Sequence, residues 1–214
     1  MSDAALRMDR MYAWQTGVYD ATRRPYLLGR DRLIESLAPP KDGRVLEIGC
    51  GTARNLIHAA RRWPHATFYG FDISPVMLEK ARQEIKRADL EDSIRVTLAD
   101  AVTFPSRIFG EAPFQRIYFS YTLSMIPEWE EALDHAAAMI PKGGCLMIAD
   151  FGDQRDLPLF FRKALGAWLG LFAVTPRVEL EAVLRATAIR HGLQCDFVSL
   201  YRGYAFLAAL RRCA

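Results

Sequence analysis

The feature that most constrains the fold is a regular alternation of short apolar runs and amphipathic stretches that begins at Arg44. The apolar runs cover residues 44–48, 67–71, 94–98, 115–119 and 145–149, and each has the length of a buried strand. The stretches at 52–62, 75–88 and 128–139 carry apolar residues at helical spacing. This alternation predicts a doubly wound, mostly parallel α/β sheet, whose ligand lies beyond the carboxyl ends of the strands.

The two ends of the chain depart from this alternation. Residues 195–201 and 204–210 are predicted to be strands of an antiparallel hairpin, which would close a seven-stranded sheet after an amphipathic helix at 177–191. Residues 4–19 and 26–37 are predicted to be extra N-terminal helices that stand outside the sheet. We therefore expect one domain over 1–214, with a helical lid segment at 1–40 and a Rossmann-like core at 44–214.

Composition excludes several classes of protein. With 51% hydrophobic and 25% charged residues, the chain is typical of a folded globular protein, and a net charge of +3 is too small for a non-specific nucleic-acid binder. The four cysteines form no CxxC pair, which argues against a zinc site or a disulfide framework and favours a reducing cytoplasm. The uncharged stretch at 164–175 is too short to span a bilayer. Peripheral contact with the inner face of the membrane and assembly into a homo-oligomer stay open.

A glycine-rich turn follows the first predicted strand. The run from Val45 to Leu56, VLEIGCGTARNL, reads as a buried strand, a tight turn and the start of a helix. Gly49 and Gly51 allow the backbone to turn sharply and to approach a ligand closely. Asp72 lies 21 residues past Gly51, at the end of the next strand, where a carboxylate can accept both hydroxyls of a ribose. The combination predicts a nucleotide-like ligand.

Two positions indicate which nucleotide binds. Arg54 stands where the dinucleotide fingerprint requires a very small residue, which disfavours NAD. Glu47, two residues before Gly49, would repel a pyrophosphate but suits a ligand that bears an ammonium or sulfonium group. S-adenosylmethionine is such a ligand.

These motifs resemble motif I and the following motif of the class I S-adenosylmethionine-dependent methyltransferases, with Ala53 in place of the usual third glycine. The resemblance implies that the cofactor is S-adenosylmethionine and that no metal takes part. It assigns the residues of the glycine loop to the methionine moiety: Glu47, Gly49, Gly51 and Asn55, with Cys50 beside them. It assigns Asp72 to the ribose, and Ile73, Met77, Asp100 and Ala101 to the adenine.

Two of these residues have plainer interpretations. Asp100 also fits a cap at the end of the third strand. Cys50 fits a small loop filler better than a nucleophile, because no basic residue lies near it in sequence.

The segment after the fourth predicted strand, residues 119–129, faces the transferred methyl group in this fold, so Tyr121 and Ser124 are candidates to contact the acceptor. It contains no Asn-Pro-Pro-Tyr run, which argues against methylation of nucleic-acid bases or protein amides. Near the N-terminus, Tyr12 and Tyr19 share one face of the predicted helix. That face either lines the acceptor pocket or packs in the core.

Most of the chain resembles one narrower family, the methyltransferases of bacterial betaine lipid synthesis, which trimethylate the amine of diacylglycerylhomoserine. The resemblance lies in the runs at 11–14, 18–24, 26–34, 120–130 and 203–206. It implies a lipid amine as the acceptor and no nucleic-acid partner. Phospholipid and soluble small-molecule methyltransferases remain alternatives, and a non-catalytic cofactor-binding partner is a further one.

The residues themselves suggest roles in such a reaction. Tyr19 and Tyr121 are the candidate catalytic residues, because a phenolic oxygen can accept a hydrogen bond from the amine and the ring can face a cation. Tyr12, Arg23, Arg24 and Ser124 are the candidate acceptor-binding residues, and the two arginines fit either an anionic headgroup or a solvated surface. Residues 157–172, apolar with one basic pair, fit a membrane-contacting helix, an acyl channel, a core helix or a subunit interface.

Overall fold

The computed structural model describes residues 27–170 and 174–213. Their seven strands form one sheet in the order β3-β2-β1-β4-β5-β7-β6. The first five of these pair in parallel, and β7 runs antiparallel to both β5 and β6. The strands are β1 (Arg44–Ile48), β2 (Thr67–Asp72), β3 (Ile94–Leu98), β4 (Arg116–Ser120), β5 (Cys145–Phe151), β6 (Gln194–Leu200) and β7 (Ala205–Arg211). The predicted doubly wound sheet and its closing hairpin are confirmed.

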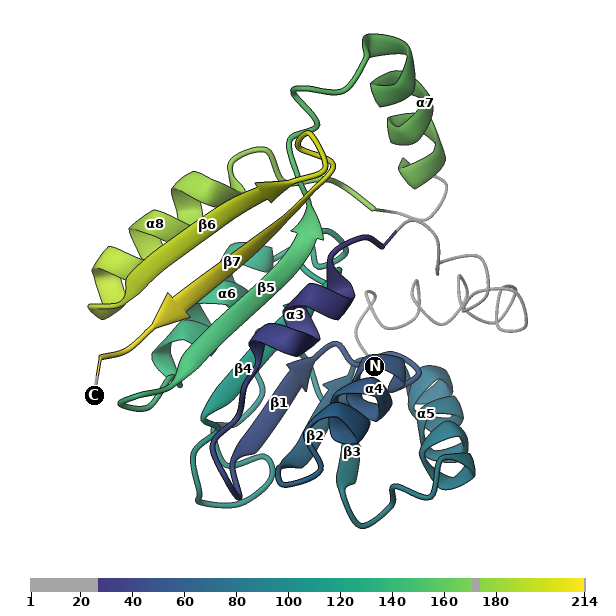
Figure 1. Cartoon of the computed structure of the whole chain (residues 1–214), viewed down its shortest axis with the longest axis vertical. Coiled ribbons are helices and arrows are strands. Elements are labelled where there is room, and N and C mark those ends of the chain that lie inside the picture. The colour runs from purple at the N-terminus through teal and green to yellow at the C-terminus, as the bar shows by residue number, and fades with distance from the viewer. Residues whose placement is uncertain (1–26, 171–173, 214) are drawn as a thin grey trace.

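Helices cover both faces of this sheet. In Figure 1, α3, α4 and α5 lie on the face toward the viewer, and α6 and α8 lie behind the strands. The helices are α3 (Arg30–Ser36), α4 (Arg54–Arg62), α5 (Pro75–Arg87), α6 (Trp129–Ala138), α7 (Leu159–Gly170) and α8 (Leu180–His191). Each face has its own apolar cluster, because alternate residues of a strand point to opposite sides. In β1, Val45 belongs to the first cluster, and Leu46 and Ile48 belong to the second.

Local backbone chemistry explains where the helices begin and end. Ser74 caps α5 by accepting a 3.3 Å hydrogen bond from the amide of Met77, and Pro75 occupies the first helical position. The helix predicted from residue 52 begins instead at Arg54, because Ala53 adopts a left-handed conformation with φ of 61°. The helix predicted from residue 26 begins at Arg30 for the same reason, since Gly29 has φ of 89°.

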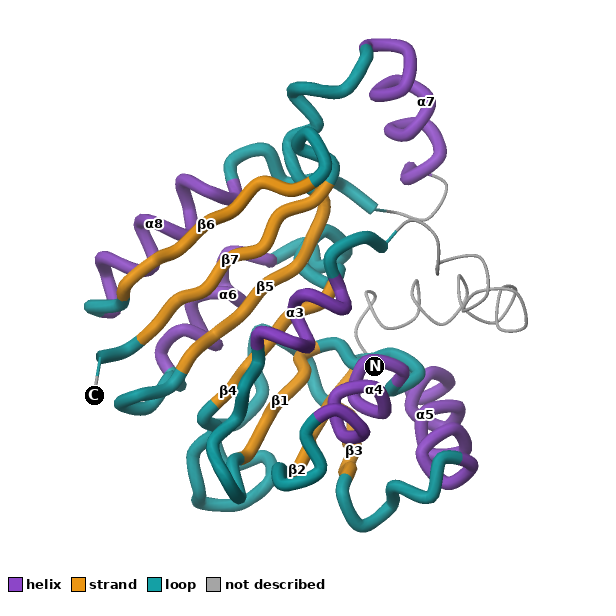
Figure 2. The backbone as a smooth tube through the Cα atoms, in the orientation of Figure 1, coloured by secondary structure: helices purple, strands orange, loops and turns teal. Residues whose placement is uncertain are grey.

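The described part of the predicted lid segment is α3 and its flanks. Leu33, Ile34 and Leu37 are almost completely buried in the first apolar cluster. The sequence predicted a helix apart from the sheet, as in a lid. Instead, α3 packs over β4 and β5, as Figure 2 shows, and its apolar residues belong to the core. Residues 1–26 of that segment lie outside the described residues.

The apolar stretch predicted at 157–172 contains α7, which projects beyond the carboxyl end of β5 (Figure 1). Leu165 and Leu169 are buried in the first cluster, whereas Leu159, Phe160 and Phe161 are 71%, 76% and 42% exposed. Among the described residues, no helix is long and apolar enough to cross a membrane.

Candidate active site

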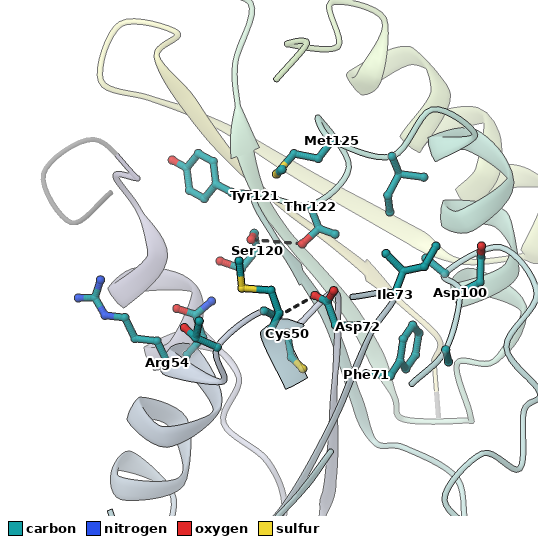
Figure 3. A pocket seen from close by; sticks show the side chains of 18 of the residues that line it. Cys50, Arg54, Phe71, Asp72, Ile73, Asp100, Ser120, Tyr121, Thr122 and Met125 are labelled. Carbon is teal, nitrogen blue, oxygen red and sulfur yellow. Dashed lines mark hydrogen bonds between the residues drawn. The ribbon is translucent and has the colours of Figure 1, made fainter. Parts of the chain in front are cut away.

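A pocket opens at the carboxyl ends of β1, β2 and β4, where the order of the strands reverses. Figure 3 shows Asp72 near its middle, Ile73 and Asp100 toward one side, and Tyr121 and Met125 toward the other. Of the residues predicted to contact cofactor or acceptor, those that line it are Gly49, Cys50, Gly51, Asn55, Asp72, Ile73, Met77, Asp100, Ala101 and Tyr121.

The glycine turn forms the floor of this pocket. The amides of Gly49 and Cys50 both donate 2.9 Å hydrogen bonds to the carbonyl of Phe71, which ties the turn to the end of β2. Gly49 has φ of 72°, and a Cβ there would lie 2.3 Å from the methyl of Thr122, so no larger residue fits. Gly51 has φ of 52°, and a Cβ there would point into open space. The turn therefore presents bare backbone to a ligand.

Asp72 links that turn to the start of α5. One carboxylate oxygen accepts a 2.8 Å hydrogen bond from the amide of Gly51, and the other accepts a 2.9 Å bond from the amide of Ser74. Asp72 is only 9% exposed, so these bonds fix its orientation at the edge of the pocket. A carboxylate held in this position can accept the two hydroxyls of a ribose.

Glu47 lies just beneath the pocket and is 1% exposed. Its carboxylate accepts a 2.8 Å hydrogen bond from the side-chain amide of Asn55, which itself lines the pocket. Burial raises the pKa of Glu47 to about 8, and the Asn55 hydrogen bond and the charge of Arg30 only partly offset that effect. A cation placed above Asn55 would favour the ionised form of Glu47. The predicted preference for a positively charged ligand thus has a structural basis.

The opposite side of the pocket is formed by apolar side chains and one acid. Ile73 and Met77 supply apolar side chains from the start of α5, and Ala101 follows β3. Asp100 accepts a 2.8 Å hydrogen bond from the amide of Val102, so it forms the local cap that the sequence also allowed. It also lines the pocket, and its contact with the adenine stays a prediction.

Tyr121 is the first residue of the segment after β4, which forms one wall of the pocket. Its backbone has a φ of 58°, unusual for a residue other than glycine, and its hydroxyl donates a hydrogen bond to the carbonyl of Leu28. The ring packs edge-on against Phe151, with centroids 4.8 Å apart. Burial raises the pKa of Tyr121 above its ordinary value, so the phenol stays protonated at neutral pH. Tyr121 therefore fastens the segment before α3 to this wall.

Ser124, predicted to contact the acceptor, lies behind the wall and is 2% exposed. Its amide donates a 3.0 Å hydrogen bond to Asp150, and its carbonyl accepts a 2.9 Å bond from the amide of Thr175. It does not line the pocket, so the structure gives it a positioning role. Burial raises the pKa of Asp150 to about 6, although bonds from Ser124 and Phe151 favour its ionised form.

The other predicted acceptor-side residues, Tyr12, Tyr19, Arg23 and Arg24, lie outside the described residues. Sequence analysis missed several residues that the fold brings to the pocket. Arg30, at the start of α3, and Thr122, against Gly49, are two of them, and Met125 is a third. Arg30 lies in the run at 26–34 that carries part of the family resemblance, but nothing in its spacing indicated proximity to the glycine turn.

The pocket has the features that S-adenosylmethionine requires. Bare backbone at Gly51, a buried acid under Asn55 and a fixed carboxylate at Asp72 lie along one cavity. A family model described as a methyltransferase domain matches residues 19–202. The chain belongs to this methyltransferase family. The prediction of an S-adenosylmethionine-dependent methyltransferase is thereby confirmed at the level of the family.

Relatives in this family act on diverse molecules. Methyltransferase GfsG of Streptomyces halstedii is 31% identical over 120 residues, which are 56% of this chain and 42% of that protein. The ubiquinone/menaquinone biosynthesis C-methyltransferase UbiE of Rhizobium rhizogenes is 29% identical over 188 residues, or 83% of this chain and 70% of its own. The chain spans about half the length of most curated relatives it matches.

Solved structures share the fold. Phosphoethanolamine N-methyltransferase 2 of Haemonchus contortus, in complex with S-adenosyl-L-methionine, superposes with a TM-score of 0.76 at 12% identity, over 100% of this chain and 61% of that one. An O-methyltransferase family protein from Burkholderia thailandensis gives 0.71 at 18% identity, over 95% and 62%. At these identities the likeness concerns the fold alone.

Proposed function

We propose that this methyltransferase transfers methyl groups to the amine of a lipid headgroup, diacylglycerylhomoserine, and carries the reaction through to the trimethylated betaine lipid. The observation that carries the proposal is the exposed apolar end of α7, which lies at the pocket edge of the sheet and bears a basic pair. The resemblance of several sequence runs to those of the betaine lipid methyltransferases favours the same acceptor.

The α7 helix has the composition of a surface that meets a lipid layer. Leu159, Phe160 and Phe161 are exposed, and Arg162 and Lys163 follow directly. Exposed aromatic and aliphatic side chains next to basic ones are typical of segments that lie in the headgroup region. The buried residues of α7 share an apolar cluster with Tyr121 and Leu27, both of which line the pocket. Because α7 projects at the edge of the sheet where the pocket opens, we expect a lipid held at α7 to present its headgroup on that side.

The chain's own groups suit methyl transfer to a neutral amine. When bound, S-adenosylmethionine supplies a methyl group carried on a positively charged sulfur. Tyr121 directs its proton at Leu28, so its oxygen can only accept, and it can receive a hydrogen bond from an amine N–H. A quaternary nitrogen placed against the Tyr121 ring would gain a cation–π interaction of roughly 0.5 to 2 kcal/mol. Positioning and exclusion of water account for most of the expected acceleration.

The direct test is methylation of defined lipids by the purified protein. Diacylglycerylhomoserine is incubated with S-adenosylmethionine, and the products are followed by mass spectrometry. We expect monomethyl and dimethyl species to rise early and the trimethyl species to accumulate at the end. The variant Asp72→Ala, which removes a predicted ribose ligand, serves as the control and should give less product at limiting S-adenosylmethionine. A reaction that stops at one methyl would contradict the trimethylation, and absence of any lipid product would contradict the lipid acceptor.

A soluble small-molecule acceptor is the second candidate. Its support is that the family relatives include a trans-aconitate 2-methyltransferase and a 27-O-demethylrifamycin SV methyltransferase, named for soluble acceptors. Phosphatidylethanolamine and a panel of soluble amines and carboxylates belong in the same assay. If methylated products appear only among the soluble compounds, the acceptor is a soluble small molecule and the lipid acceptor is wrong. Binding of cofactor without any product would favour a non-catalytic partner.

A further inference from the structure

A second groove, larger than the cofactor pocket, begins beside it and crosses the helical face of the domain. It lies between α3 and α4 and reaches the end of α5. Its basic residues are Arg30, Arg32, Arg54, Arg61, Arg87 and His58, and its acidic residues are Asp31 and Glu84. The groove thus has a clear excess of positive charge.

The two acids are already paired inside the groove. Asp31 lies 3.6 Å from His58, and Glu84 lies 2.5 Å from Arg87. Among the described residues, Arg30, Arg54 and Arg61 form no ion pair within 4.0 Å. Arg32 likewise forms none, so four guanidinium groups that line this groove have no carboxylate within 4.0 Å in the part of the chain that the structure describes, although the more distant charges of Asp31 and Glu47 act on Arg30.

Arg30 is the most constrained of the four. Burial lowers its pKa, and the neighbouring charge of Arg54 lowers it further. Two guanidinium groups held close together in a partly buried place repel each other, and an anion between them removes that cost. Planar guanidinium groups bind carboxylate and phosphate oxygens through paired hydrogen bonds.

The groove is continuous with the cofactor pocket but extends well past it. Arg30 and Arg54 line both cavities, whereas Arg61 and Arg87 line the groove alone. Arg54 and Arg61 are seven residues apart on α4, which corresponds to about 10 Å along the helix axis. The residues of the glycine turn, Gly49 and Gly51, line only the pocket. The outer arginines are thus separate from the predicted cofactor contacts.

We propose that this arginine groove binds an oxyanion of the methyl acceptor, a carboxylate or a phosphate, and so restricts the enzyme to acceptors that carry a negative group near the methylated atom. The inference rests on methyl transfer in the adjoining pocket and names the acceptor's charge class. The homoserine carboxylate of the proposed lipid belongs to this class, as does the phosphodiester of a phospholipid.

The experiment measures direct binding to the full chain saturated with S-adenosylhomocysteine. Short-chain diacylglycerylhomoserine, short-chain phosphatidylethanolamine and the matching uncharged diacylglycerol are titrated by calorimetry. Both lipid headgroups are zwitterionic and carry an oxyanion that the diacylglycerol lacks, so we expect at least one of them to bind and the diacylglycerol to bind more weakly. Loss of preference between anionic and uncharged probes would overturn the proposal. The comparison of the two headgroups identifies carboxylate or phosphate as the preferred anion.

A matched pair of variants locates the site. Arg61→Ala should weaken binding of the preferred anionic probe about tenfold, because a hydrogen-bonded charge partner is lost. Arg62→Ala is the control, because this neighbouring exposed arginine lies over the ring of Trp63 at 4.4 Å and does not line the groove. Equal effects of the two substitutions would overturn the proposal. Melting temperatures of both variants confirm that each is folded.

The result separates this inference from the proposed function. If anionic probes bind through Arg61 but no lipid is methylated, the lipid acceptor fails and the anion groove stands. If diacylglycerylhomoserine is methylated with the same KM by Arg61→Ala and by the parent protein, the groove proposal fails and the lipid acceptor stands.

Discussion

The cofactor side and the acceptor side of the site are built on different principles. On the cofactor side, the acids Glu47, Asp72 and Asp100 each accept a hydrogen bond from a neighbouring backbone or side-chain group. On the side we propose for the acceptor, Phe160 is three-quarters exposed, and Arg61 forms no ion pair with any other described residue. The acids on the cofactor side are held by hydrogen bonds in a preformed arrangement, whereas the proposed acceptor side keeps apolar and charged groups exposed to a partner.

The largest expected effect is on the cofactor side. Gly49→Ala places a methyl 2.3 Å from the Cγ2 of Thr122 at a residue whose φ is 72°. We expect a loss of about 3 kcal/mol or more in the free energy of unfolding, from overpacking and backbone strain together. Denaturant titration measures it. Gly110→Ala, where φ is 97° and a Cβ meets nothing within 4 Å, is the control for strain alone. Equal losses would show that Thr122 does not restrict the turn.

The ribose carboxylate comes next. Asp72→Ala should weaken binding of S-adenosylhomocysteine by about 1 to 3 kcal/mol, the usual cost of removing a hydrogen bond to a charged group. It should also lower stability, because the amides of Gly51 and Ser74 lose their acceptor. Calorimetry at fixed pH measures the affinity. Undiminished affinity would remove Asp72 from the cofactor site.

The third prediction concerns pH. Because the pKa of Glu47 is about 8 in the free protein, a cationic ligand must shift it downward on binding. Affinity for S-adenosylmethionine should therefore rise with pH by up to about tenfold per unit below pH 8, and level off above it. Glu47→Gln should flatten this profile. Adenosine, which lacks the charged methionine part, should bind without the slope, and a slope with adenosine would point to another group.

The same carboxyl affects folding in the opposite sense. A raised folded-state pKa contributes stability that is fully present below the ordinary value of 4.5 and is lost as pH rises through about 8. Unliganded Glu47→Gln should therefore be more stable than the parent at pH 9, and the difference should shrink toward pH 4. Thermal unfolding at several pH values measures this. An identical pH dependence of the two proteins would contradict the burial of an ionisable group there.

The smallest effect on stability is expected on the acceptor side. Phe160→Ser should change the free energy of unfolding by no more than about 0.5 kcal/mol, because the ring is 76% exposed. Cofactor affinity should not change. Binding to vesicles that contain diacylglycerylhomoserine should nevertheless fall, as sedimentation with the vesicles would show. Unchanged vesicle binding would separate α7 from lipid recognition and weaken the contrast between the two sides.

Much of the architecture was predictable because it depends on short-range patterns. Apolar runs of strand length and Ser74-Pro75 at a helix start act within a few residues, and the predicted strands and most helices were confirmed within two residues. The helix starts at Arg30 and Arg54 were missed because each follows a left-handed residue. A glycine at 29 can adopt many conformations, and an alanine at 53 gives no sign that it has a positive φ.

The sequence by itself determined the parallel core, the glycine turn, and the spacing that brings Asp72 to that turn, since consecutive strands of a doubly wound sheet end at the same edge. Only the tertiary structure decided that Ser124 is buried against Asp150 and that Arg30 meets Arg54 at the mouth of a groove. Those contacts join segments 24 to 26 residues apart with no shared periodicity. The first arises because β4 and β5 are neighbours in the sheet. The second arises because α3 packs against the first apolar cluster and Tyr121 holds the preceding segment at Leu28.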